Sequence, residues 1–133
     1  MRVLCLVMVL AVAGLTLLGG CESDDGGGGT LLAQGTIAVP ASGGTDATTV
    51  QATAPGTLQC RLTWSGEPPE FEAAFKHVAS GDIHGMSFSA SPLISTAAVS
   101  SADVAGGSDW QFLAGNGAAT AVNVEYEIRF FPN

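Results

Sequence analysis

Two histidines and an aspartate in the middle of the chain are the residues whose types best suit a transition metal. His77, Asp82 and His84 lie within eight positions of one another. Two imidazoles and one carboxylate can bind a metal and leave a coordination position open. Their irregular spacing falls across a Ser-Gly turn, however, and ordinary polar loop residues explain it equally. We therefore predict no bound metal. A metal-dependent enzyme with these three residues at its centre is the third functional alternative, after a binding module and a structural protein.

A neighbouring group of acidic residues could supply paired carboxylates for general acid–base chemistry. Glu70 and Glu72 would share one face of a strand, and Glu67 lies just before them. Nothing in the sequence identifies a pocket around them, and a solvated edge is the simpler interpretation. The serine-rich stretch 87–101 lacks a Gly-x-Ser-x-Gly elbow, so nothing supports nucleophilic hydrolysis. We predict that the chain is not an enzyme.

One cysteine and two tryptophans each allow a functional and a structural interpretation. Cys60 could be a reactive thiol, but it alternates with Leu58 and Leu62, which predicts a buried and inert side chain. The indoles of Trp64 and Trp110 could stack on sugar rings. Both occupy the apolar side of an alternating run, so we predict that they belong to the core.

The first residues have the pattern of an export signal. Residues 3–18 are 16 uncharged, mostly apolar residues, preceded by Arg2 and followed by Gly19 and Gly20. A retained transmembrane helix is the alternative, but this run is slightly shorter than the roughly 17 to 25 residues that such a helix needs. A basic start, an apolar middle and small residues at the end predict a signal peptide over residues 1–20.

The end of this segment resembles a family motif. Leu18, Gly19, Gly20 and Cys21 resemble the lipobox of bacterial lipoproteins. The resemblance implies cleavage before Cys21 and lipid on its thiol, and two or more acyl chains hold a protein stably on a membrane. Glu22 departs from the Asp that favours inner-membrane retention in the enteric sorting rule. An outer-membrane destination is therefore expected if the organism has two membranes.

The charge balance argues against nucleic acid as a partner. The chain has four Lys or Arg residues and twelve Asp or Glu residues, a net charge of −8. Removal of residues 1–20 takes Arg2 away, so twelve acidic residues face three basic ones and the mature net charge is −9. Such a surface repels phosphate backbones, so we predict no nucleic-acid binding.

Composition divides the rest of the chain into a tether and one domain. Residues 21–30 combine the expected lipidated cysteine with Ser, Asp and four consecutive glycines, which predicts a flexible tether. Residues 31–133 are long enough for one hydrophobic core. Cys60 is the single cysteine in that part, so the core has no intramolecular disulfide to support it.

Hydrophobic residues recur with a period of two, which predicts β-strands. Segment 70–79 fits a helix as well as a strand, and no other segment after residue 30 has a convincing helical period. The clearest alternating runs are residues 58–64, 110–114 and 122–130, and weaker strand candidates are residues 34–39, 47–53, 70–75, 83–89 and 93–99.

Turn residues separate these runs, and Asn116-Gly117 predicts a hairpin joining the last two strands. Short strands at this spacing predict an all-β fold, a single antiparallel β-sandwich or jelly-roll-like domain.

Four segments of the domain together have the pattern and spacing of a known family. They are Ala54–Leu58 leading into Leu62–Trp64, then Phe71–Phe75, Gly107–Phe112 and Val124–Ile128. In these segments the chain resembles the pre-peptidase C-terminal-like family of bacteria. The resemblance implies a β-sandwich accessory module linked to secretion or binding, and not an enzyme. This sequence has Glu67-Pro68-Pro69-Glu70-Phe71-Glu72 where many members carry an Asp-Leu-Asp-like cluster, so no metal role is carried over.

Together these features predict a lipoprotein that presents a non-catalytic β-sandwich module at the cell envelope. The expected partners are the membrane, through lipid on Cys21, and an envelope polymer or protein. The alternative is a structural or assembly component of an envelope protein complex. No cofactor is expected.

Overall fold

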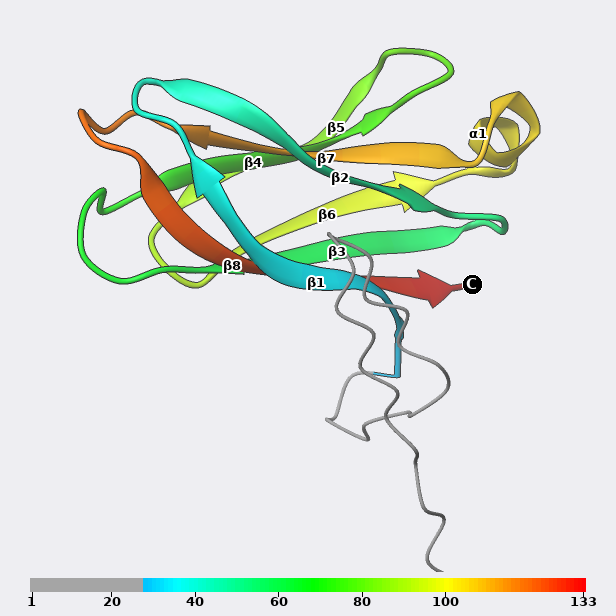
Figure 1. Cartoon of the computed structure of the whole chain (residues 1–133). Coiled ribbons are helices and arrows are strands. Elements are labelled where there is room, and N and C mark those ends of the chain that lie inside the picture. Colours follow the sequence, from blue (N-terminus) through cyan, green and yellow to red (C-terminus); the bar gives the residue numbers. More distant parts are fainter. Residues whose placement is uncertain (1–27) are drawn as a thin grey trace, which may run out of the picture.

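The computed structural model describes residues 28–133, except the side chains of residues 45–47. This part of the chain folds into eight strands and one short helix (Figure 1). The elements are β1 (Thr30–Val39), β2 (Gly43–Gln51), β3 (Gly56–Thr63), β4 (Phe71–His77), β5 (Ile83–Ser89), β6 (Leu93–Val99), α1 (Ser101–Gly106), β7 (Asp109–Asn116) and β8 (Val122–Pro132).

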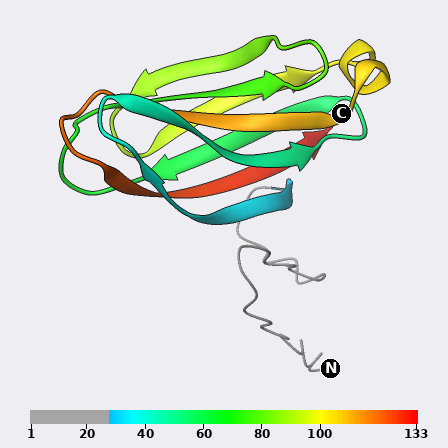
Figure 2. The ribbon, with the colours of Figure 1, turned by 45° about the horizontal axis from the view of Figure 1, so that its top comes forward.

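The strands form two four-stranded antiparallel sheets that pack face to face (Figures 1 and 2). Sheet A has the order β1-β8-β3-β6, and sheet B has the order β2-β7-β4-β5. The pairing is nested along the chain: β1 pairs with β8, β2 with β7, β3 with β6 and β4 with β5. A long hairpin rolled up in this way is a jelly roll, so the predicted all-β sandwich is confirmed.

The alternating runs form strands because one face of each sheet covers the core. In β3, Leu58, Cys60 and Leu62 are completely buried, while Arg61 between them is exposed. The predicted core positions of β7 are buried in the same way, and in β8 Val124, Ile128 and Phe130 are buried while Val122 and Tyr126 are partly buried. A shift of one residue would place the charged row of β8 in the core, so its register is well specified. The largest buried side chains of the core are Trp110, Phe71, Phe75, Phe112, Leu58, Leu62, Leu93 and Ile128.

The sandwich has two distinguishable ends. Thr30 at the start of β1 pairs with Phe130, and Gly56 at the start of β3 pairs with Pro132. We call this end, which also carries α1 and the C terminus on the right of Figure 1, the near end. The β1–β2 and β7–β8 connections lie at the opposite, far end, so all chain before Thr30 leaves from the near end.

The predicted hairpin between the last two strands is wrong. β7 lies in sheet B and β8 in sheet A, so the connection at Asn116-Gly117 crosses from one sheet to the other. The side chain of Asn116 is buried and holds this crossing. Its Nδ2 donates to the carbonyl oxygens of Val39 and Thr120 at 3.2 and 2.9 Å, and its Oδ1 accepts from the Ala118 amide at 2.8 Å.

The structure decides one open alternative and corrects one other local prediction. Segment 70–79, which fitted either type of element, forms strand β4 because both of its neighbours, β5 and β7, pair with it. A short helix, α1, was not predicted. It begins with a capping box in which the Ser100 hydroxyl accepts from the Asp103 amide and the Asp103 carboxylate accepts from the Ser100 amide. Six residues are too few for a helical period to show.

The signal peptide over residues 1–20, the lipobox and Cys21 lie outside the described residues. Of the predicted tether, the last three residues are described. Gly29 lies against the ring of Phe131, its carbonyl accepts from Arg129 Nη1 at 3.2 Å, and Thr30 is already the first residue of β1. Among the described helices, none has the length and apolar character needed to cross a membrane.

Candidate functional site

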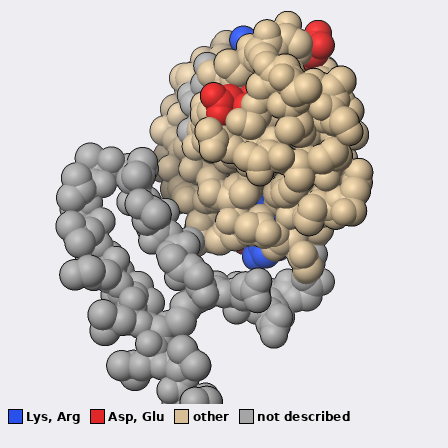
Figure 3. Space-filling model, turned by 90° about the vertical axis from the view of Figure 1, so that its right-hand side faces the viewer, with Lys and Arg blue, Asp and Glu red and all other residues tan. Residues whose placement is uncertain are grey.

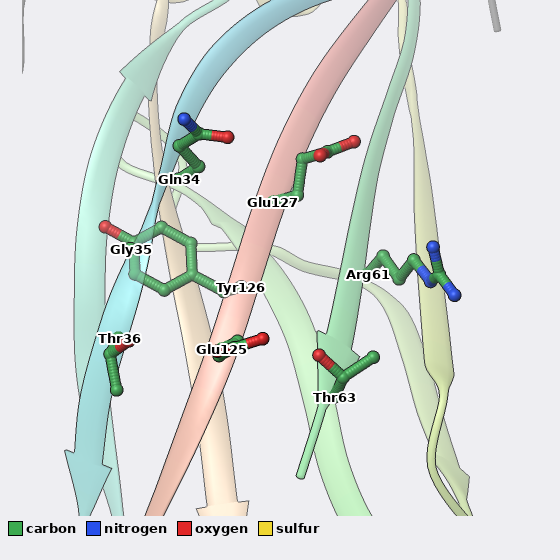
Figure 4. Close-up of a pocket in the computed structure, with 8 residues that line it drawn as sticks. All are labelled: Gln34, Gly35, Thr36, Arg61, Thr63, Glu125, Tyr126 and Glu127. Atoms are coloured by element: carbon green, nitrogen blue, oxygen red, sulfur yellow. The ribbon is translucent and has the colours of Figure 1, made fainter. Parts of the chain in front are cut away.

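A polar hollow of about 520 Å³ lies over the outer face of sheet A, across β1, β8 and β3 (Figure 4). It is open to solvent, and most of the side chains around it can donate or accept hydrogen bonds. Its lining residues are Gln34, Gly35, Thr36, Arg61, Thr63, Glu125, Tyr126 and Glu127.

Strand register places the polar side chains in two parallel rows. Glu125 on β8 lies between Thr36 on β1 and Thr63 on β3. Two residues further along β8, Glu127 lies between Gln34 on β1 and Arg61 on β3. Residues separated by two positions share one face of a sheet, so the two rows lie side by side and form the polar surface of the hollow.

Sheet A itself forms the floor of the hollow, and Gly35 and Tyr126 support it from the core side, because they alternate with the outward residues Thr36 and Glu125. Gly35 lies opposite Tyr126 in the β1–β8 ladder. A Cβ atom at position 35 would lie 3.3 Å from the Tyr126 hydroxyl, which is closer than most such contacts. Glycine therefore leaves room for the tyrosine ring beside β1, where Figure 4 shows it. The ring also stacks on Phe112, with 6.2 Å between ring centroids, so the floor is anchored to the core.

The charged groups around the hollow have different partners. Glu127 accepts a hydrogen bond from Arg129 Nε, which neutralises one carboxylate locally. In Figure 4 the Thr63 hydroxyl turns toward Glu125, while the Arg61 side chain extends away from β8. Among the described residues, Arg61 and Glu125 take part in no ion pair. The hollow therefore offers the Glu125 carboxylate, hydroxyls, an amide and, at its edge, the Arg61 guanidinium to a ligand.

Sequence reasoning did not identify this hollow. The alternating runs 58–64 and 122–130 place Arg61, Glu125 and Glu127 on outer faces, but the sequence does not show that β1 and β3 both lie beside β8. A glycine within a strand is a usable signal, because it often marks the close approach of another group. Gly35 lay within a predicted strand and was not interpreted in this way.

The structure gives the candidate metal ligands other partners. His77 is buried, its Nδ1 lies 3.0 Å from the Ser80 hydroxyl, and its Nε2 lies 2.7 Å from the Gly107 carbonyl oxygen. Asp82 is exposed and receives the His77 amide hydrogen on its backbone oxygen. Within residues 28–133, no group of three or more His, Cys, Asp or Glu side chains is arranged to hold a metal ion.

The two histidines instead flank one core tryptophan. The rings of His77 and His84 lie 4.8 and 5.2 Å from Trp110, measured between centroids. The Ser80 hydroxyl beside His77 also accepts from the Asp82 amide at 3.2 Å. This Ser–His contact therefore belongs to the turn between β4 and β5, where it orders the loop.

The remaining sequence candidates occupy separate places. Cys60 is completely buried, and burial raises the pKa of its thiol far above the usual range. Trp110 is also completely buried, as predicted. Trp64 is partly buried, packs edge-on against Phe71 with 4.7 Å between centroids and donates its Nε1–H to the Pro68 carbonyl. Neither indole is placed as a platform for a sugar.

The three glutamates 67, 70 and 72 form no common site. Glu67 and Glu70 are exposed in the β3–β4 connection, and Glu72 points outward from sheet B. They therefore lie away from the hollow on sheet A.

Comparison with known proteins finds few relatives. No protein-family model and no curated protein matches the sequence. Among solved structures, the chain is similar to one from Bacillus endospore appendages, described as a novel family of disulfide-linked pili. The two share 15% sequence identity, the match covers 89% of this chain and 100% of the other, and the TM-score is 0.42. A similarity with this TM-score and sequence identity gives no information about the ligands or partners of this chain.

Proposed function

We propose that this protein is a membrane-anchored bacterial lipoprotein whose jelly-roll domain binds a neutral, hydroxyl-rich polymer of the cell envelope without transforming it. The observation that carries the proposal is the open polar hollow across β1, β8 and β3. A groove that is open along a sheet suits an extended chain better than a small molecule, which prefers an enclosed, mostly apolar pocket.

The chemistry of the lining supports this ligand class. Glu125 accepts hydrogen bonds, Thr36 and Thr63 both donate and accept, and Gln34 offers an amide. Sugar hydroxyls are donors and acceptors at once, so they can satisfy all of these groups. An anionic polymer would meet Glu125 and a domain of high negative charge, so a neutral polymer fits better.

Binding without chemistry is supported by the absence of an assembled catalytic group in the described part of the chain. Nucleophilic catalysis needs a base within hydrogen-bond reach of the nucleophile and facing the substrate. The only serine–histidine contact there, Ser80 with His77, belongs to a turn at the near end. Finding turnover of a glycan that depends on Glu125 would overturn this part of the proposal.

Anchoring through Cys21 is supported by the lipobox-like motif and by the position of β1. Eight residues separate Cys21 from Thr30, a reach of at most about 30 Å. The near end, from which this segment leaves, presents mainly uncharged side chains on its described surface (Figure 3). Because few charged side chains lie at this end, anionic lipid head groups would repel it only weakly. The hollow, on the side of the sandwich, would remain accessible.

Two experiments test the proposal separately. Anchoring is tested by following the full chain in cell fractions with a fatty-acid label. The wild type should carry label in the membrane fraction, whereas Cys21→Ser should carry none and keep the mass of the unprocessed chain. A wild type without label, or a C21S variant that is labelled like the wild type, would contradict lipid anchoring.

Binding is tested by calorimetry of the detergent-solubilised full chain with neutral oligosaccharides, such as chitotetraose and cellotetraose. We expect saturable binding that Thr63→Val weakens roughly tenfold, since a lost hydrogen bond with its desolvation cost contributes about 1 to 3 kcal/mol. The matched control is Thr49→Val on the exposed face of sheet B. Equal effects of the two substitutions would contradict binding in the hollow.

A structural or assembly role is the second candidate, and a separate observation favours it. Edge strand β5 exposes Ile83, Met86 and Phe88 to solvent, with 46, 65 and 66% of each residue accessible. Several exposed apolar side chains in one row mark a surface that contacts another molecule.

A further inference from the structure

The outer face of sheet B is apolar at its centre. It carries a shallow hollow of about 280 Å³ above Ala74, bordered by Leu113, Ile83 and Met86. We call these four residues, together with Phe88, the apolar face. It lies on the opposite side of the sandwich from the polar hollow, so the two surfaces can act independently.

A β-bulge sets the shape of this face. Between the pairs Ala73–Ser87 and Phe75–His84, two residues of β5, Gly85 and Met86, oppose the single residue Ala74. Gly85 has a positive φ of 64° and lies directly against the backbone of β6. Bulges of this kind re-aim the neighbouring side chain. The result here is an outward methionine at mid-height of the face.

The two charged residues of β4 are arranged symmetrically about Ala74. The register of β4 with its two neighbours defines three rows. In the middle row, Ala74 lies beside Leu113 of β7. Two residues away along β4 in one direction, Glu72 lies beside Phe88 of β5. Two residues away in the other direction, Lys76 lies beside Ile83 of β5. A carboxylate and an ammonium group therefore stand at equal distances on either side of an apolar centre.

We propose that this face binds the same face of a second copy of the chain, with the strands of the two copies running in opposite directions. A two-fold axis through the Ala74 row and perpendicular to the strands places Glu72 of each copy opposite Lys76 of the other. It also places Phe88 opposite Ile83 of the second copy. In such an isologous contact, Glu72 of each copy pairs with Lys76 of the other, which gives two ion pairs.

The charges also exclude the other symmetric arrangement. A two-fold axis parallel to the strands would place Glu72 opposite Glu72 of the second copy and Lys76 opposite Lys76. Like charges facing each other across an interface oppose association. Among the described residues Lys76 takes part in no ion pair, so it is available for this contact. Met86, flexible and unbranched, can fill the shallow hollow of its partner.

The contact is modest in size. Three strands of seven or eight residues form a face of roughly 25 by 15 Å, which is smaller than a standard specific interface and therefore gives a weak, transient dimer. Association is therefore concentration-dependent. It requires neither the lipid anchor nor the polar hollow, so its failure would leave the proposed function intact.

The experiment measures crosslinking of the full chain, carrying a cysteine at the centre of the face, with a short bismaleimide. Met86→Cys should give a crosslinked dimer, because the two copies of position 86 face each other near the axis. The matched control is Thr96→Cys, exposed on β6 of the other sheet, which should give only the background of the wild type. Cys60 is fully buried and does not compete for the reagent, and any reaction at Cys5 or Cys21 is present in the wild type and is subtracted as background.

Charge substitutions in the Met86→Cys background then test the geometry. Glu72→Lys and Lys76→Glu should each reduce the yield several-fold, since each puts two pairs of like charges in contact. Mixing the two single variants, with different tags, should restore a heterodimer to near the original yield. The double variant E72K/K76E should restore the homodimer.

Three results would overturn the proposal. One is an equal yield from positions 86 and 96. The second is a dimer whose yield ignores both charge reversals, which would indicate a different orientation. The third is a crosslink of position 86 only to other proteins, which would make the partner a different chain. Thermal unfolding of each variant, expected within a few degrees of the wild type, separates loss of contact from loss of fold.

Discussion

Gly35 on β1 faces Tyr126 on β8, and the space that a side chain at position 35 would fill is occupied by the tyrosine ring. We expect Gly35→Val to push this ring away from β1 and to distort the floor of the polar hollow. Overpacking of this kind costs about 1 to 3 kcal/mol of unfolding free energy. Calorimetry with the neutral oligosaccharides should show binding lost while the domain remains folded.

A control for this substitution is Gly117→Ala in the connection between β7 and β8, where an added Cβ meets nothing within 4 Å. It should leave both stability and binding unchanged. Unchanged binding in G35V would show that the ligand does not use the floor of the hollow.

Gly85 and Gly81 allow steric collision to be separated from backbone strain. Both have positive φ, 64° and 79°, but only a Cβ at Gly85 collides with a neighbour, the carbonyl of Thr96. Gly81→Ala should cost about 1 to 2 kcal/mol for the left-handed conformation alone. Gly85→Ala should cost roughly 3 kcal/mol or more, since the collision adds to the strain. Urea unfolding of the two variants measures the difference, and equal losses would mean that β5 and β6 separate easily.

Burial of Cys60 should make stability fall at alkaline pH. Burial raises the pKa of this thiol in the folded state far above its ordinary value of 9.0, so the folded protein keeps the proton after the unfolded chain has lost it. The stabilisation is complete below about pH 9 and decreases by roughly 1.4 kcal/mol for each pH unit above it.

The comparison variant is Cys60→Ala, because it removes the thiol and leaves the other titrating groups in place. The difference in unfolding free energy between wild type and C60A should shrink between pH 9 and 11. A difference that stays constant would mean that the thiol ionises in the folded protein. Thiol reagents should modify Cys60 only after unfolding.

The capping box of α1 makes a prediction at acidic pH. The backbone amide of Ser100, and then its hydroxyl, lower the pKa of the Asp103 carboxyl below its ordinary value of 3.8. A lowered pKa gives stability that is present above 3.8 and lost as the pH falls through the folded value. Ser100→Ala should bring the pKa of Asp103 back toward 3.8 and cost about 1 kcal/mol.

NMR titration of the Asp103 carboxyl carbon measures this shift directly. Ser101→Ala, one position further on and outside the capping box, is the control and should leave the titration unchanged. If both variants titrated alike, the Ser100 hydroxyl would not contribute to the lowered pKa of Asp103.

Much of the fold could be predicted from single strands. The runs 58–64 and 122–130 alternate so regularly that burial of one face follows from the period of two alone. Strands β5 and β6 began and ended where the residues predicted. The helix α1 was missed because one turn is too short for a period, although Ser100 and Asp103 carry its capping pattern.

The arrangement of the strands was less predictable. Asn116-Gly117 has the local chemistry of a hairpin, yet β7 and β8 pair with other strands in different sheets. Local turn propensity contributes little compared with burial of a whole strand face. The buried hydrogen bonds of Asn116 to Val39 and Thr120 depend on residues that only the fold brings near. No short segment contains that information.

The sequence by itself determined the class of the fold, its core positions and its acidic surface, because these depend on alternation and composition along the chain. It also provides the whole basis for the proposed lipid anchor, the motif ending at Cys21. Only the tertiary structure decided which outer faces carry surfaces that could bind another molecule. The polar hollow joins Gln34, Thr63 and Glu125 from three strands, and the apolar face joins Ala74, Met86 and Leu113 from three others. Such surfaces arise from strand order and register, which are set by long-range pairing and not by neighbouring residues.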